Sequence, residues 1–168
     1  MKNTIKTTLG FIVIAAALTF FGCKKDNDTN LPYQAQGNYG NSNIVNTVFK
    51  GQLFQQIPSS GGTFGLTLSD PAITQTVLNN SSVNVYIQSG GGPDTVSWYV
   101  LPATIQGAMF TVSFGIGKVT VIGSTEPAFC LPNVNVRVVI ISAARIRQNP
   151  NVNFNDYSEV KKAFHLKD

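Results

Sequence analysis

The chain has few of the side chains that most often carry chemistry: in 168 residues there are one histidine, two cysteines and one tryptophan. So few histidines and cysteines argue against a multi-ligand metal centre and against a cysteine-rich scaffold. Charged residues make up 12% of the chain, which is about half of the usual share in globular proteins. The 12 basic and 8 acidic residues form no clustered basic face, so we expect no nucleic-acid partner.

The start of the chain has the pattern of an export signal. Two lysines lie within the first six residues, and residues 9–21 then carry no charge. This stretch is shorter than the roughly 20 apolar residues that a helix needs to cross a bilayer. The small residue Gly22 precedes Cys23, so the pattern predicts a signal peptide over residues 1–22. An uncleaved membrane anchor is the alternative.

Phe20-Phe21-Gly22-Cys23 resembles the lipobox of bacterial lipoproteins, with Gly22 and Cys23 as the matching residues. In that family a peptidase cuts before the cysteine, which then carries fatty-acyl chains such as palmitate. The resemblance implies lipidation of Cys23 and anchoring in the outer membrane, at the cell surface or on the periplasmic face. Two or more acyl chains give stable anchoring. A secretory signal with an incidental cysteine is the alternative.

The segment after this cysteine is polar. Residues 24–42 are rich in Asn, Asp, Gly, Gln and Thr and show no period of 2 or 3.6. We therefore predict a flexible tether over residues 23–42, followed by one domain over residues 43–168. Lys24-Lys25-Asp26 resembles the export tag of surface lipoproteins in the Bacteroidota group of Gram-negative bacteria.

Alternation of apolar and polar residues in the domain predicts β-strands. It runs through residues 64–68, 83–87, 96–100 and 110–116. Residues 134–141 are almost continuously apolar, which is typical of a central strand that is covered on both faces. Glycine and proline turns separate the stretches, so we expect a mainly β fold, either an antiparallel β-sandwich or a small barrel.

Two helices are expected beside the strands. Asp70-Pro71 has the signature of a helix N-terminus, with Asp70 as the N-cap. A C-terminal helix follows Asp156, which would form a capping-box pair with Glu159. We expect this second helix to close one end or edge of the sandwich.

No group of side chains in the sequence points to catalysis. His165 follows the last predicted helix, where the helix dipole stabilises a cation. Cys130 lies between two bulky apolar residues and is expected to be a buried, inert thiol, with a reactive thiol or an intermolecular bridge as the alternative. No two acidic residues can be nominated to flank a cleft. We therefore expect no enzymatic activity, no metal and no cofactor.

Aromatic residues are the candidates for ligand contact. Tyr86 and Tyr99 alternate with apolar neighbours, so we expect both on the polar faces of their strands, where they would contact a glycan or a protein. Cross-strand packing of these tyrosines is the alternative. Trp98 shares a face with Val96 and Val100 by the same alternation and is expected in the core.

Three arginines and one threonine complete the candidates. Arg137, Arg145 and Arg147 are expected to be solvated cations on an exposed sheet edge, with an anion site as the alternative. Asp94-Thr95-Val96 is similar to an O-glycosylation signal of exported proteins from the same bacterial group, which implies Thr95 as a modified residue.

The domain also resembles small uncharacterised lipoprotein β-domains of these bacteria. Trp98, Leu101-Pro102, the strand at residues 137–141 and Asp156-Tyr157 carry this resemblance, which implies a fold but no activity. We expect a lipid-anchored cell-envelope protein that acts as a non-enzymatic binding or accessory module. Its partners would be the membrane, through Cys23, and a glycan or a protein. A structural envelope subunit that docks through a sheet edge is the second hypothesis, and a hydrolase is the third.

Overall fold

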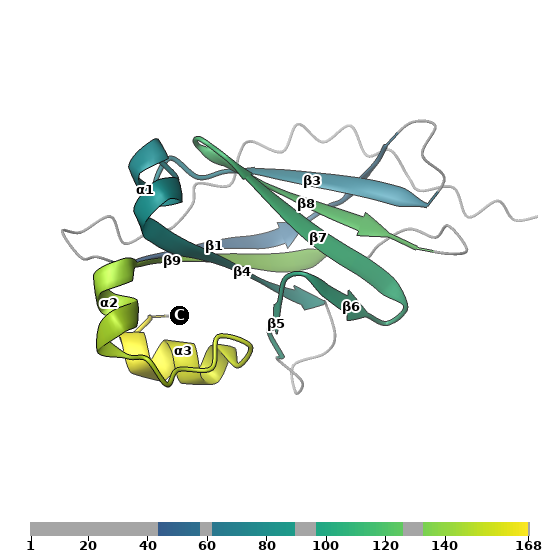
Figure 1. The fold of residues 1–168 in the computed structure, drawn as a ribbon. Helices are drawn as coiled ribbons and strands as arrows, with labels where there is room; N and C mark the ends of the chain where they lie inside the picture. Colours follow the sequence, from purple (N-terminus) through teal and green to yellow (C-terminus); the bar gives the residue numbers. More distant parts are fainter. Residues whose placement is uncertain (1–43, 58–61, 90–96, 126–132, 168) are drawn as a thin grey trace, which may run out of the picture.

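The computed structural model describes residues 44–57, 62–89, 97–125 and 133–167. In these ranges nine strands form two antiparallel sheets, and three helices accompany them (Figure 1). The two sheets pack face to face, so the sandwich form of the predicted mainly β fold is confirmed.

The four-stranded sheet is built around a central strand. Its strands, in spatial order, are β1 (Ile44–Gln52), β9 (Val134–Ser142), β4 (Ser81–Ser89) and β5 (Tyr99–Val100). Val138 on β9 faces the other sheet, and its neighbour Val139 faces the C-terminal helices. Both faces of β9 are therefore covered, which explains its almost continuous apolar sequence and confirms the predicted central strand.

The five-stranded sheet is flanked by short strands. Its spatial order is β2 (Gln55–Gln56), β3 (Thr63–Ser69), β8 (Lys118–Ser124), β7 (Ala108–Gly115) and β6 (Ala103–Ile105). Strand β8 lies in the centre and pairs over its whole length with β3 and β7. The alternating apolar residues of these three strands point toward the four-stranded sheet.

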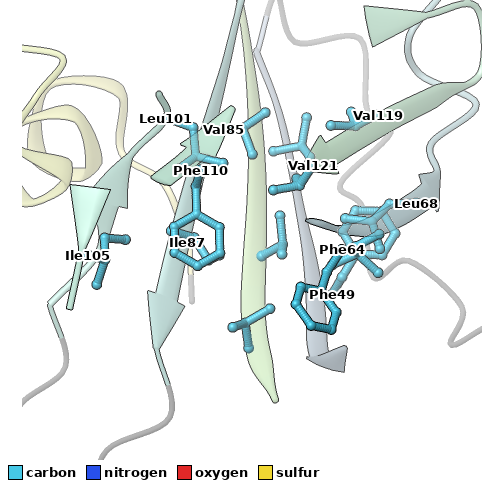
Figure 2. Packing of buried hydrophobic residues seen from close by; sticks show 14 of the residues in the cluster. Phe49, Phe64, Leu68, Val85, Ile87, Leu101, Ile105, Phe110, Val119 and Val121 are labelled. Carbon is cyan, nitrogen blue, oxygen red and sulfur yellow. The ribbon is translucent and has the colours of Figure 1, made fainter. Parts of the chain in front are cut away.

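The main core lies between the two sheets. Figure 2 shows side chains from both sheets meeting in one layer, with Phe49, Val85 and Ile87 from the four-stranded sheet. Phe64, Phe110 and Val121 come from the five-stranded sheet. Removal of these side chains from water is the dominant stabilising contribution to such a fold.

The first helix, α1 (Gln75–Asn80), starts later than the sequence predicted. Thr74 is its N-cap, and the Thr74 hydroxyl accepts the N–H of Val77 at 3.2 Å. Asp70 instead lies in the turn before the helix, where its Oδ1 accepts the N–H of Ala72 at 3.1 Å. The prediction of Asp70 as the N-cap was therefore wrong, because its carboxyl group closes a local turn.

The C-terminal helix, α3 (Tyr157–Phe164), begins where it was predicted. Asp156 is its N-cap and accepts the N–H groups of Ser158 and Glu159. The Glu159 carboxylate accepts the N–H of Asn153, so the expected reciprocal bond to Asp156 is replaced. Helix α3 packs on the outer face of the four-stranded sheet, whereas we had expected it at an end or edge (Figure 1).

A further helix, α2 (Ala143–Gln148), was not predicted. It follows β9 directly, and the Ser142 hydroxyl caps it by accepting the N–H of Arg145 at 3.4 Å. Its partly buried Ile146 joins the cluster under α3.

Candidate functional site

Arg137 is buried on the outer face of β9, with 4% of its surface exposed. Its Nη1 donates to the Tyr157 hydroxyl at 2.5 Å, to the main-chain oxygen of Lys167 at 3.2 Å and to Oδ1 of Asn46 at 3.4 Å. The guanidinium carbon lies 4.9 Å from the ring centre of Trp98 and 4.8 Å from that of Tyr157. Arg137 therefore connects β1, β9, the segment before β5 and the C-terminal region.

The sequence prediction that Arg137 is a solvated cation on a sheet edge was wrong. β9 is a central strand, and α3 covers the face from which Arg137 projects. An arginine keeps its charge when buried, so its loss of hydration must be offset by the protein. Here two aromatic rings and charge-assisted hydrogen bonds provide that compensation.

Tyr86 is fully buried under the same helix. Its hydroxyl donates to the main-chain oxygen of Phe154 at 3.0 Å, and its ring meets that of Tyr157 edge-on at 5.1 Å. Burial, followed by the proximity of Tyr157 and Asp156, raises the pKa of Tyr86 above its ordinary value. Tyr86 is a packing residue and does not present a surface to a ligand.

Tyr99 is 44% exposed, but it does not lie beside Tyr86. In the pairing of β4 with β5, Tyr99 is opposite Ile87 and Tyr86 is opposite Val100. Because consecutive residues of a strand point to opposite faces, the two tyrosines lie on opposite faces of the sheet. The expected patch of two exposed tyrosines does not form.

Trp98, Arg145 and Arg147 lie at positions that differ in part from the expected ones. Trp98 is partly buried, as expected for a core residue, but in the cluster under α3 and not between the sheets. Arg145 and Arg147 lie in the last turn of α2 and not on a sheet edge. Arg145 Nη1 donates to Oε1 of Gln148 at 3.2 Å, and Arg147 is exposed.

Asp70 and Thr47 are buried polar residues on the inner side of the four-stranded sheet. Oδ2 of Asp70 and Oγ1 of Thr47 have no hydrogen-bond partner of good geometry within the described ranges. Burial raises the pKa of Asp70, while the N–H of Ala72 and the nearby Thr47 hydroxyl oppose the rise.

The turn between β7 and β8 exposes two large apolar side chains. Ile116 is 65% exposed, the most of any large apolar residue that the structure describes, and Phe114 is 40% exposed. We call residues 114–118 the hairpin tip. The alternation that buries Phe110 continues into this tip, past the residues that the opposite sheet covers. The sequence predicted an alternating strand through Ile116 with turn glycines at residues 115 and 117, but it did not predict that Phe114 and Ile116 would be exposed.

The main chain of the hairpin tip is held by the turn between β3 and α1. Gly117 donates its N–H to the oxygen of Ile73 at 2.7 Å, and its own oxygen accepts the N–H of Asp70 at 2.9 Å. Gly117 has a φ of +72°, a conformation that favours glycine. Both polar main-chain groups of this turn residue are therefore satisfied within the protein.

Lys118 lies against the hairpin tip. It is paired with Gly115 across the hairpin, and a Cβ atom at Gly115 would lie 3.0 Å from Cε of Lys118. The absence of a side chain at residue 115 therefore leaves room for the lysine stem. Lys118 is therefore an exposed cation that lies along residue 115, on the face of the hairpin opposite Phe114.

Cys23, Thr95 and Cys130 lie outside the described residues, so lipidation, glycosylation and the state of the thiol stay predictions. His165 is the C-cap of α3, at the helix end where it was expected. It adopts a left-handed conformation with a φ of 53°.

Within the described ranges, no three His, Cys, Asp or Glu side chains are grouped so that they could hold a metal ion. None of the described helices has the length and apolar character needed to cross a membrane. No family model, curated protein or solved structure matches the chain.

Proposed function

We propose that this protein is a lipid-anchored component of the bacterial outer membrane that acts as a non-enzymatic binding or accessory module. The export segment and Cys23 support the anchor. The binding role rests on the hairpin tip, where Ile116 and Phe114 are exposed on a main chain that is hydrogen-bonded in place. Clustered exposed apolar side chains mark interaction surfaces.

The positions of the buried polar groups support a contact role over catalysis. Asp70 and Thr47 lie on the inner side of the four-stranded sheet, whereas Tyr86 and Arg137 lie on its outer side. A catalytic site brings a nucleophile, a base and an electrophilic group within reach of one substrate atom. The four-stranded sheet separates these groups, so they do not converge on one substrate atom.

Replacement of the lipidated cysteine tests the anchor. We expect the wild-type N-terminal peptide to begin at Cys23 and to carry acyl chains in mass spectra of membrane fractions. The Cys23→Ser variant should lose both the acyl mass and its stable membrane association, whereas Cys130→Ser should retain them. Protease treatment of intact cells then distinguishes the cell surface from the periplasmic face. A Cys23→Ser product that fractionates with membranes just as the wild type does would refute the proposal.

Docking through a sheet edge is the second candidate function, and β1 favours it. This edge strand has nine residues, whereas the edge strands β2, β5 and β6 have two, two and three residues. In the part of the chain that the structure describes, β1 has a strand neighbour on one side only, and its one charged residue is Lys50. Long edges with little charge favour pairing with another strand.

The edge hypothesis predicts a change of oligomeric state. Val48 lies in the middle of β1 and is partly buried. A Val48→Lys substitution should convert a multimer of the detergent-extracted protein into a monomer, as measured by light scattering. A wild-type protein that is monomeric at micromolar concentration, with no cross-linked neighbours in cells, would contradict this second function.

A further inference from the structure

We propose that the hairpin tip inserts into the surface of the bilayer that holds the lipid anchor. Ile116 would enter the apolar layer, and Lys118 would lie at the anionic head groups. The inference rests on the proposed anchoring through Cys23, and it assigns a lipid surface as the partner of the hairpin tip.

The hairpin tip lies at the same end of the sandwich as Ile44, the first residue of β1 after the segment that starts at Cys23. Ile44, the first residue of β1, is paired with Ile141 near the end of β9, and α2 follows directly. Ser81, which follows α1, is paired with Ser142 at this same end. Asp70 and Ile73, which lie just before α1, form main-chain hydrogen bonds with Gly117. Figure 1 shows α1, α2, the start of β1 and the β7–β8 turn at one end of the molecule.

The length of the tether favours this end of the sandwich as the side that meets the membrane. Cys23 and Ile44 are 21 positions apart in the sequence. The polar composition of this segment predicts a flexible chain, and a flexible chain of that length has a root-mean-square span of about 25 Å. A strand of nine residues, such as β1, extends about 30 Å, so the opposite end of the sandwich lies that much farther from the anchor.

Charge at this end of the sandwich is also suited to an anionic lipid surface. Lys118 lies in the hairpin tip, and Arg145 and Arg147 lie in α2. The acidic residues of the described ranges are the buried Asp70 and the two residues Asp156 and Glu159 at the start of α3. Basic side chains close to a bilayer are attracted to anionic head groups.

The polar main-chain groups of Gly117, in the hairpin tip, are bonded within the protein. Polar main-chain groups that enter a bilayer need partners within the protein. The N–H and the oxygen of Gly117 are both bonded to the turn before α1. The stem of Lys118 lies along Gly115, from where its ammonium group can remain at the head groups while Ile116 penetrates.

The depth of a label at residue 116 tests the insertion. The acylated protein, carrying Cys130→Ser and Ile116→Cys with an environment-sensitive fluorophore, is placed in vesicles of phosphatidylethanolamine and phosphatidylglycerol. Brominated acyl chains should quench this label several-fold more than a label at Met109→Cys. Met109 is a matched control because it is 54% exposed and belongs to the same hairpin, about 20 Å from residue 116 along the strand.

The charge of Lys118 supplies a second test in the same labelled protein. Lys118→Gln should lower the ratio of inserted to free tip about fivefold in vesicles with phosphatidylglycerol, and by less in neutral vesicles. Lys50→Gln is the matched control, because this exposed lysine lies six positions beyond Ile44 on β1. If the two substitutions change the ratio of inserted to free tip equally, the result would count against contact of the hairpin tip with the anionic bilayer.

Failure of the anchor and failure of the insertion give different results. The mass of the N-terminal peptide reports acylation of Cys23 without reference to the label. If Cys23 carries no lipid, the anchor is refuted, and quenching at residue 116 after addition of the protein to preformed vesicles still measures insertion. Equal quenching at residues 116 and 109 overturns the insertion. A label at residue 116 that is protected from aqueous iodide but not quenched by lipid also overturns it, because a second copy or another protein then covers the tip.

Discussion

Nη1 of Arg137 lies 2.5 Å from the hydroxyl oxygen of Tyr157, and this hydrogen bond joins the central strand β9 to the C-terminal helix α3. Both side chains are buried, and the same guanidinium group also lies over the ring of Trp98. A polar bond in an otherwise apolar interface favours one position of the helix on the sheet, because any other position would leave a buried charge without this partner.

Removal of the Tyr157 hydroxyl should destabilise the domain. Tyr157→Phe keeps the ring but removes a hydrogen bond from a charged group, so we expect the free energy of unfolding to fall by about 1.5–3 kcal/mol. Tyr99→Phe is the control, because Tyr99 is 44% exposed and its loss should cost less than about 0.5 kcal/mol. Urea denaturation measures both values. Similar losses in the two variants would show that the bond to Arg137 adds nothing to stability.

Tyr86 should make stability fall at alkaline pH. Burial raises the pKa of Tyr86 above the ordinary value of 10.0, so the folded state holds this proton more tightly than the unfolded state. The resulting stabilisation is complete below pH 10 and is lost as the pH rises through the raised pKa. The difference in unfolding free energy between wild type and Tyr86→Phe should therefore be constant below about pH 10 and shrink as the pH rises above that value. A difference that does not change with pH would contradict the assignment.

The contributions of Asp70 and Asp156 to stability should change with pH in opposite directions. Burial raises the pKa of Asp70, so its contribution to stability is present at low pH and is lost as the pH rises. Asp70→Asn should therefore raise the free energy of unfolding at pH 7 by on the order of 1 kcal/mol and have a smaller effect near pH 3.

Asp156 is the opposite case and serves as the comparison. Hydrogen bonds from the side chain and then the main chain of Ser158 lower the pKa of Asp156, so its stabilisation is present near neutral pH and is lost as the pH falls. Asp156→Asn should lower stability at pH 7 and have less effect in acid. Thermal unfolding at pH 7 and near pH 3 measures the stability of both variants. Changes of stability at pH 7 with the same sign in Asp70→Asn and Asp156→Asn would be inconsistent with these assignments.

Two phenylalanines on one face of β7 should differ in their contribution to stability. Phe110 is 4% exposed and Phe114 is 40% exposed. Phe110→Ala should cost about 3–5 kcal/mol, since it leaves a cavity between the sheets. Phe114→Ala should cost less than half as much, because much of its surface already meets water. Comparable losses in denaturant titrations would mean that Phe114 belongs to the core and is not available to a partner.

Much of the fold followed from alternation along the chain. Phe64, Leu66 and Leu68 alternate with polar residues and are buried together, and the apolar run at residues 134–141 became the central strand. Asp156 was correctly identified as an N-cap because this role depends on the next few residues alone. Asp70 precedes a proline, which also favours a helix N-terminus, but its carboxyl group accepts the N–H of Ala72 in a turn.

The candidate site was harder to predict. Alternation placed Tyr86 on the face opposite Val85, which is correct, but it could not show that α3 covers that face. Arg137 was assigned to the surface for the same reason, because the aromatic rings that receive it come from distant segments. Ile116 was assigned to a strand face, whereas it lies beyond the cover of the opposite sheet.

A period of two along the chain distinguishes the two faces of each strand, because successive side chains point in opposite directions, and the charge pattern at the start of the chain identifies an export segment. Those properties depend on near neighbours and can be read from the order of residues. Whether a face meets water, a helix or the second sheet depends on contacts between distant segments. For that reason the burial of Arg137 and Tyr86 and the exposure of Ile116 emerged from the packing of the domain.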